Sequence, residues 1–200
     1  MFSAAVVGGC ALSEGYKYNT APVAFRGIAA SGLVSLVVQD ARPYVVSGNK
    51  PEKFAGLLRG GYGNPFDVST STGNPLAVDI RDAIVRGLNA SGVNVVTAVA
   101  SPADPVTRVR SGLQATNARR HIHVTLHEWK TDSLINTSLY YDLTVAVLDG
   151  RGATLAERRI KGEDELGGTM GMGPEDRIVA GVGKRLNEIF ADPQIVAALR

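Results

Sequence analysis

The chain has 200 residues, of which 44% are hydrophobic and 20% are charged, and its formal net charge at pH 7 is +2. These proportions are close to the averages of globular proteins. The charge is too small, and the basic residues are too scattered, to predict a nucleic-acid-binding protein. No stretch reaches the roughly 18 consecutive apolar residues that a membrane-spanning helix needs. We therefore expect one domain of about 150 to 190 residues, large enough to bury its own core.

The only cysteine, Cys10, follows a run of small and apolar residues. Val7 stands three residues before it, with Gly8 and Gly9 between, and small residues before a cleavage point suit the pocket of a signal peptidase. The stretch resembles a bacterial lipobox. This resemblance implies cleavage before Cys10, a thioether-linked lipid on its sulfur and acylation of the new amino terminus. An incidental or buried cysteine is the alternative.

This interpretation divides the chain into three parts. We interpret residues 1–9 as a truncated lipoprotein signal region, 10–20 as a lipidated tether and 21–200 as a single α+β domain. The lipid would be the attachment to the membrane, on the periplasmic face of the outer membrane. Ala11 is not an inner-membrane retention signal of the aspartate kind.

The first half of the domain begins with a predicted short strand at residues 22–29, followed by a stronger strand and a hairpin arm. Residues 33–42 are rich in β-branched side chains, and Asp40 and Arg42 project to the same side at the end of this strand, which predicts an ion pair. Between residues 45 and 72, turn formers flank two short predicted strands. This arm has more apolar and aromatic residues than a simple turn needs, so we predict that it contacts a partner protein. The candidate contact residues are Phe54, Leu57, Leu58, Tyr62 and Phe66.

Two later segments have the pattern of amphipathic helices. One follows Asn74, a predicted N-cap, and Pro75, with an apolar residue every fourth position. The other follows Pro174 and ends near Phe190. Between these two helices, four segments have the apolar pattern of strands, at residues 93–99, 121–127, 137–149 and 154–161. We expect an α+β fold, with a twisted, mostly antiparallel or mixed sheet and both helices packed on one face.

The three histidines of the sequence, His121, His123 and His127, fall on one face of one predicted strand. A His-x-His pair can bind zinc or copper, which makes His121 and His123 candidate metal ligands. His127 lies about 13 Å further along an extended strand. Because no fourth ligand is evident, we predict no metal and no cofactor here, and a solvated polar face instead.

The order of these features resembles that of the YajG-type bacterial lipoproteins. The features are the lipobox cysteine, a strand ending in Val38-Gln39-Asp40-Ala41-Arg42, a glycine-bearing hairpin, and a helix from Leu76 to Ala90 closed by Ser91-Gly92. The resemblance covers Cys10 to about Val99 and is mainly architectural beyond it. It implies an outer-membrane lipoprotein that faces the periplasm, and it carries no catalytic residues.

The sequence therefore predicts a lipid-anchored envelope lipoprotein that acts as a non-catalytic binding or scaffolding module. No set of acid, base and nucleophile can be assembled from neighbouring motifs, so we expect no enzyme. Its partners would be the membrane, through the anchor, and another envelope protein. The alternative is a periplasmic metal-binding protein or enzyme that uses the strand of His121, His123 and His127.

Overall fold

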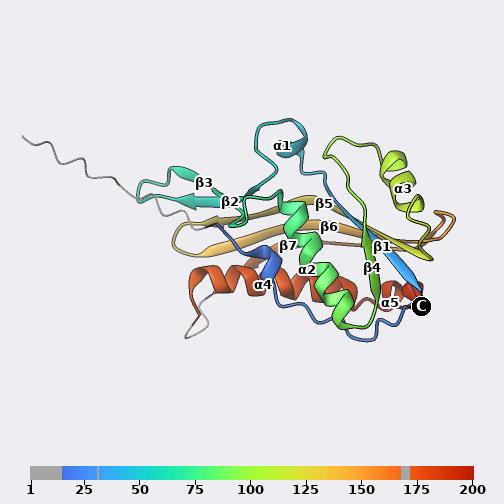
Figure 1. The fold of residues 1–200 in the computed structure, drawn as a ribbon. Coiled ribbons are helices and arrows are strands. Elements are labelled where there is room, and N and C mark those ends of the chain that lie inside the picture. The colour runs from blue at the N-terminus through green and yellow to red at the C-terminus, as the bar shows by residue number, and fades with distance from the viewer. Residues whose placement is uncertain (1–14, 31, 168–171) are drawn as a thin grey trace, which may run out of the picture.

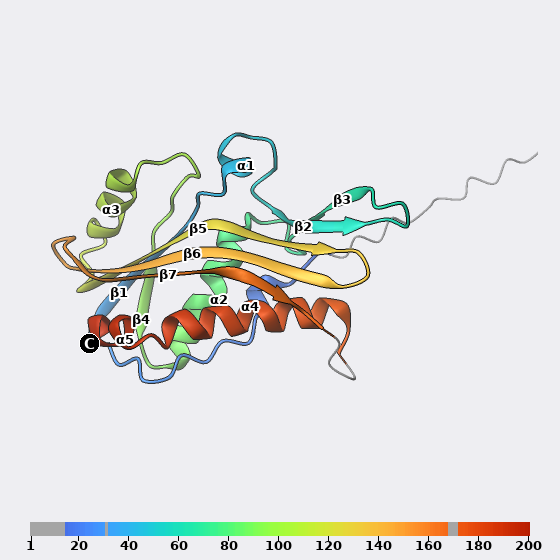
Figure 2. The ribbon, with the colours of Figure 1, turned by 180° about the vertical axis from the view of Figure 1, so that it is seen from behind.

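The computed structural model describes residues 15–30, 32–167 and 172–200, so Cys10 lies outside the described residues. Within these ranges, seven strands form one mixed sheet, shown from two sides in Figures 1 and 2. The strands are β1 (Leu33–Asp40), β2 (Phe54–Arg59), β3 (Pro65–Ser69), β4 (Asn94–Thr97), β5 (Arg120–Ser133), β6 (Thr137–Asp149) and β7 (Thr154–Glu165). The helices are η1 (Tyr18–Thr20), α1 (Pro43–Val46), α2 (Leu76–Ala90), α3 (Val106–Gln114), α4 (Pro174–Phe190) and α5 (Pro193–Leu199).

Strand β5 lies at the centre of the sheet and is paired on both edges. One edge pairs antiparallel with β6, which pairs in turn with β7. The other edge pairs in parallel with β1 along residues 120–126 and with β2 along residues 131–133. The chain leaves the sheet between β1 and β2 to form α1, and opposite this gap β5 has a bulge between Leu126 and Glu128. Outside β1 and β2 lie the edge strands β4 and β3.

Helices α2 and α4 cover the same face of the sheet, as predicted. Their apolar stripes belong to one hydrophobic core with the inward side chains of β1, β5 and β6. The stripes are Leu76, Ile80, Ile84 and Leu88 on α2, and Ile178, Val182, Leu186 and Phe190 on α4. Helix α3 packs on the opposite face, where Val109 and Leu113 contact Val37 and Leu148. The α+β fold with a mixed sheet is therefore confirmed.

Two local predictions are wrong. The N-cap of α2 is Pro75 and not Asn74, because Asn74 is held one residue earlier in a turn in which its N–H donates to Thr72. Residues 22–29 form no strand. Instead this segment runs across the helices, where Phe25 stacks on Phe190 with 4.4 Å between ring centroids. Such close packing requires Gly87, since a Cβ there would lie 2.7 Å from the Phe25 ring.

The folded domain begins before residue 21, where we placed the end of the tether. Tyr16 and Tyr18 are buried in the main core. The Tyr16 N–H donates to the carbonyl of Ser69, and the Ser71 N–H donates to the carbonyl of Tyr16, so the chain is tied to the end of β3. Residues 15–20 are therefore part of the domain, because their aromatic side chains fill core positions.

Candidate functional site

Asp40 and Arg42 form an ion pair in the gap between β1 and β2. The Nε and Nη2 groups of Arg42 donate to the two carboxylate oxygens of Asp40 at 2.7 and 2.6 Å. Nη1 donates to the backbone carbonyls of Phe54 and Trp129, and Nη2 donates to that of Glu52. Arg42 thereby connects the end of β1, the start of β2 and the part of β5 beside its bulge.

This pair is structural, because both side chains are enclosed by the protein. A buried charge is tolerated when it is paired and when its remaining polar atoms are hydrogen-bonded. Burial lowers the pKa of Arg42, but the hydrogen bonds and the charge of Asp40 outweigh this effect and raise it. The guanidinium therefore stays charged, and its contacts are with the protein itself.

The three histidines lie on one face of β5, but two of them are buried, so the predicted solvated face is wrong. Helix α3 covers this part of the sheet. The Nδ1 atom of His121 lies 2.6 Å from the hydroxyl of Ser35. The Nε2 atom of His123 lies 3.2 Å from the side-chain oxygen of Gln39. His127, beyond the end of α3, is half-buried.

Burial lowers the pKa of all three histidines. For His123 the nearby Arg110 and His127 lower it further, and its pKa falls to about 4, so this imidazole is neutral at pH 7. Within the described residues, no group of three or more His, Cys, Asp or Glu side chains is placed to hold a metal ion. The arrangement of His121 and His123 is that of hydrogen-bonded side chains beneath a helix.

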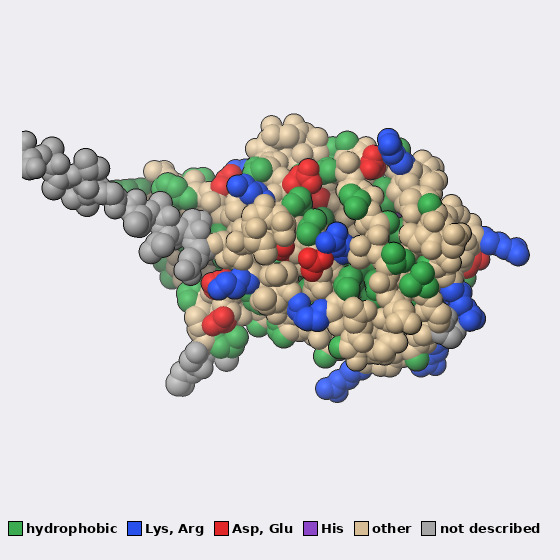
Figure 3. Space-filling model, in the orientation of Figure 1, with side chains coloured by type: hydrophobic (Ala, Val, Ile, Leu, Met, Phe, Trp, Pro, Cys, Tyr) green, Lys and Arg blue, Asp and Glu red, His purple; other side chains and the backbone are tan. Residues whose placement is uncertain are grey.

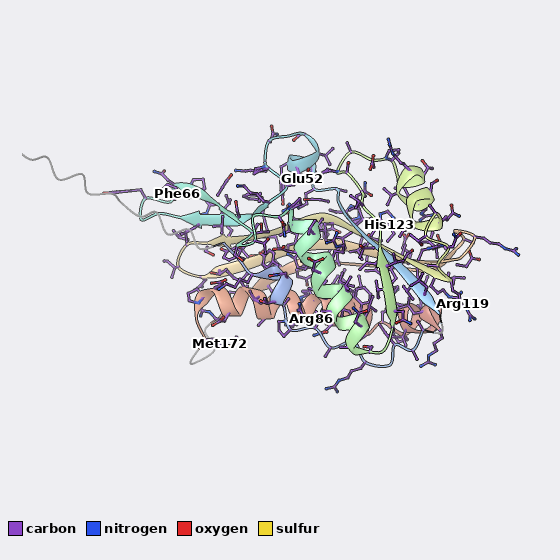
Figure 4. The ribbon with its side chains drawn as sticks, in the orientation of Figure 1. Glu52, Phe66, Arg86, Arg119, His123 and Met172 are labelled. Carbon is purple, nitrogen blue, oxygen red and sulfur yellow. The ribbon has the colours of Figure 1, made fainter. Side chains whose placement is uncertain are left out.

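One end of the molecule exposes large apolar side chains on two neighbouring turns. In the β2–β3 hairpin the exposed fraction is 50% for Leu58, 100% for Tyr62 and 60% for Phe66. In the β5–β6 turn it is 57% for Leu134 and 95% for Ile135. We call these five residues the apolar end. Hydrophobic side chains are visible there over the hairpin in Figure 3, and Figure 4 places Phe66 at the end of the molecule where α4 begins.

Two of the predicted contact residues behave differently from the rest. Phe54 is buried, with its ring packed edge-on against Tyr44 at 5.5 Å, so its prediction as a contact residue is wrong. Leu57 is half-buried. The Phe54 ring is covered by Tyr44 and Lys50, and residues 56–58 of β2 pair with β5, which brings Leu57 into the sheet. Only the outer part of the arm projects.

The apolar end borders a groove of about 660 Å³. Leu58 and Val68 line it from the hairpin, Leu134 and Ile135 line it from the β5–β6 turn, and Pro174 and Ile178 line it from α4. Tyr16 also lines the groove, so the chain enters the fold at this end. Four residues lie between Cys10 and Gly15, and the five steps from one Cα atom to the other span at most about 18 Å in an extended chain.

Both regions contain residues that the sequence pattern did not identify as functional candidates. Leu134 and Ile135 lie between two predicted strands, and two adjacent large apolar residues in a tight turn are a signal of an exposed contact surface. Arg110 and Arg159, which flank the histidine strand, are not identifiable from spacing, because they come from α3 and β7.

In the described part of the chain, no helix is long and apolar enough to cross a bilayer.

No family model and no curated protein matches the sequence. The chain is similar to several solved structures. Protein XCC0632 from Xanthomonas campestris, of the family DUF330, is 12% identical with a TM-score of 0.51, and the match covers 90% of this chain and 92% of that one. The hypothetical protein CT253 from Chlamydia trachomatis is 18% identical over 84% of this chain and 95% of its own, with a TM-score of 0.45. PelC from Paraburkholderia phytofirmans, crystallised as a dodecamer, is 12% identical over 84% and 92%, with a TM-score of 0.44.

At these identities the likeness concerns the fold alone. The Xanthomonas campestris structure matches the chain over most of both lengths, so the α+β architecture also occurs in that protein. Membership of the YajG-type family stays a prediction.

Proposed function

We propose that this protein is a lipid-anchored lipoprotein of the bacterial envelope that binds or scaffolds another envelope protein and does not catalyse a reaction. The observation that carries the proposal is the apolar end with its groove, at the place where the chain leading to Cys10 enters the fold. An anchor at Cys10 would hold this surface beside the bilayer, on the periplasmic face of the outer membrane.

The apolar end has the properties of a protein contact surface. A group of exposed apolar side chains at the rim of a groove often marks a binding site. The groove of about 660 Å³ has the size of a binding pocket. Two exposed aromatic side chains, Tyr62 and Phe66, belong to the same hairpin as Leu58, and aromatic residues are enriched among the side chains that contribute most to interface energy. An apolar helix or strand of a partner fits this geometry.

Charged side chains beside the apolar end suit a specific contact. Lys50 forms an ion pair with Asp67 on the hairpin, and Arg59 forms one with Asp132 across the β2–β5 pairing. These pairs are partly exposed, and interfaces typically have a polar rim around an apolar centre. We therefore assign the outer hairpin and the β5–β6 turn as the contact surface, with Leu58, Tyr62, Phe66, Leu134 and Ile135 as its centre.

Anchoring is tested by mass spectrometry of the full-length product from a bacterial host. We expect an acylated fragment that begins at Cys10. The variant Cys10→Ala should move the protein from the membrane fraction to the soluble periplasmic fraction. An unmodified thiol on membrane-extracted protein contradicts the anchoring.

Partner binding is tested by placing a photoreactive amino acid at single positions in intact cells. Positions Tyr62 and Ile135 should each crosslink to the same envelope protein. Val99 is a matched control, because it is 85% exposed and lies away from the groove. Equal capture from Val99, or no capture from either position at the apolar end, contradicts the assigned contact surface and leaves the anchoring result unaffected.

A further inference from the structure

A second concave site lies on the other face of the sheet, between α3 and strands β5 to β7. It has a volume of about 320 Å³, at the lower end of the range for ligand pockets. His123 and His127 line it from β5, Thr144 lines it from β6, Arg159 lines it from β7, and Arg110 lines it from α3. Figure 4 shows His123 beside α3, far from Phe66 at the apolar end. We infer that this pocket binds the oxyanion group of a small molecule, a phosphate or a carboxylate.

The polar groups of the pocket are mainly hydrogen-bond donors. The guanidinium groups of Arg110 and Arg159 can only donate, and hydroxyl groups can donate to an anion as well. Arg159 is oriented by Asp142, to whose two oxygens it donates at 2.6 and 2.7 Å. Thr125 and Thr144 add hydroxyl groups. A set rich in donors fits a ligand rich in acceptors.

Arg110 gives the strongest indication of a missing acceptor. Its Nε atom is buried, and among the described residues no hydrogen-bond acceptor lies in reach of it. A buried donor without an acceptor is uncommon in folded proteins and calls for an explanation. The same guanidinium contributes to the lowered pKa of His123. The pocket thus places a positive charge beside an imidazole, and this charge disfavours protonation of the ring.

The charges in the pocket favour an anion over a metal ion. Two guanidinium groups, Arg110 and Arg159, face one carboxylate, Glu157, which is exposed. Asp142 already pairs with Arg159 and Lys161. A divalent cation would be repelled by both guanidinium groups, whereas an oxyanion would accept hydrogen bonds from them.

The test follows the histidine ring protons by NMR in the full chain with Cys10→Ala, during addition of sodium phosphate against sodium chloride at equal ionic strength. We expect saturable shifts of the His123 and His127 signals with phosphate only. A bound anion favours the protonated imidazole, so the pKa of His123 should rise on saturation. This ring faces Arg110 on α3 and His127 on β5, with Arg159 and Glu157 on β7 across the pocket.

Three variants separate a specific site from general screening. Arg110→Gln should weaken phosphate binding by about tenfold or more, the effect of losing one charge-assisted hydrogen bond. Arg108→Gln on the same helix is the matched control, because Arg108 points to solvent and should leave binding unchanged. Glu157→Gln should tighten binding by removing the one repelling carboxylate.

Two results would overturn the inference. One is a shift that grows linearly with ionic strength and is the same for phosphate and chloride. The other is equal binding by the Arg110→Gln and Arg108→Gln variants. If Arg110→Gln unfolds, the Glu157→Gln variant still decides, since unchanged or weaker binding there contradicts the predicted repulsion. Acetate in place of phosphate distinguishes a carboxylate site from a phosphate site.

Discussion

Replacement of Arg42 by Met should destabilise the domain more than any surface change of the same kind. Methionine keeps much of the aliphatic volume but removes the guanidinium that donates to Asp40 and to the carbonyls of Glu52, Phe54 and Trp129. The Asp40 carboxylate would remain buried without its partner. Breaking a buried ion pair by removing one member costs about 3 to 5 kcal/mol, a large part of the roughly 5 to 15 kcal/mol of a typical domain.

The assay is equilibrium unfolding in urea. Trp129 is the only tryptophan in the sequence, and its carbonyl accepts a hydrogen bond from Arg42, so its fluorescence reports on the affected region. Circular dichroism should give the same transition if unfolding is two-state. Arg59→Met is the matched control, because Arg59 also forms a two-point ion pair, with Asp132, but at a partly exposed site. A loss for Arg42→Met no larger than that of the control would refute the idea that Arg42 joins β1, β2 and β5.

Two further predictions concern packing and pH. Gly56→Ala should lower the free energy of unfolding by about 1 to 3 kcal/mol. The Cβ of the new alanine would lie 2.7 Å from the carbonyl oxygen of Thr131, where β2 pairs with β5. Thermal melts measure the loss of stability. The pKa of His123 is about 4 in the folded protein, compared with 6.5 for an unperturbed histidine. As the pH falls from about 6.5 to 4, the unfolded chain takes up a proton that folded His123 does not, so stability should fall by up to about 3 kcal/mol. His123→Gln should flatten this part of the curve of stability against pH.

Each of these two predictions has a control. Gly61→Ala, at a position where an added Cβ meets nothing within 4 Å, should leave the melting temperature nearly unchanged. If it destabilises the domain as much as Gly56→Ala, the close approach to β5 is not the cause. A stability curve for His123→Gln that is as steep as that of the parent between pH 6.5 and 4 would show that other groups dominate.

Much of the architecture could be predicted from local pattern. The four-residue repeat of α2 and the stripe of α4 each mark one apolar face, and both helices do cover one side of the sheet. The alternation around Ile122, Val124 and Leu126 places the histidines on the other face of β5. Asp40 and Arg42 could be paired from their spacing, because residues two apart in a strand share a face.

The environment of these residues could not be predicted in the same way. Alternation shows that His121 and His123 face away from the core, but it does not show that α3 covers them. The hairpin looks uniform in sequence, yet Phe54 is buried against Tyr44 while Tyr62 is fully exposed. In each case the deciding contact comes from an element distant in the chain.

By itself the sequence determined the type of each main element, the face that each one buries and the ion pair at the end of β1, because these depend on neighbours within a few residues. The tertiary structure decided the parallel pairing of β1 and β2 along one edge of β5, and with it the gap that Arg42 fills. It also brought Arg110 and Arg159 to His123, and two turns together at the apolar end. The guanidinium of Arg42 and the carbonyl of Trp129 are 87 positions apart in the chain. A contact over that separation depends on how whole strands pair, which no local pattern of side chains specifies.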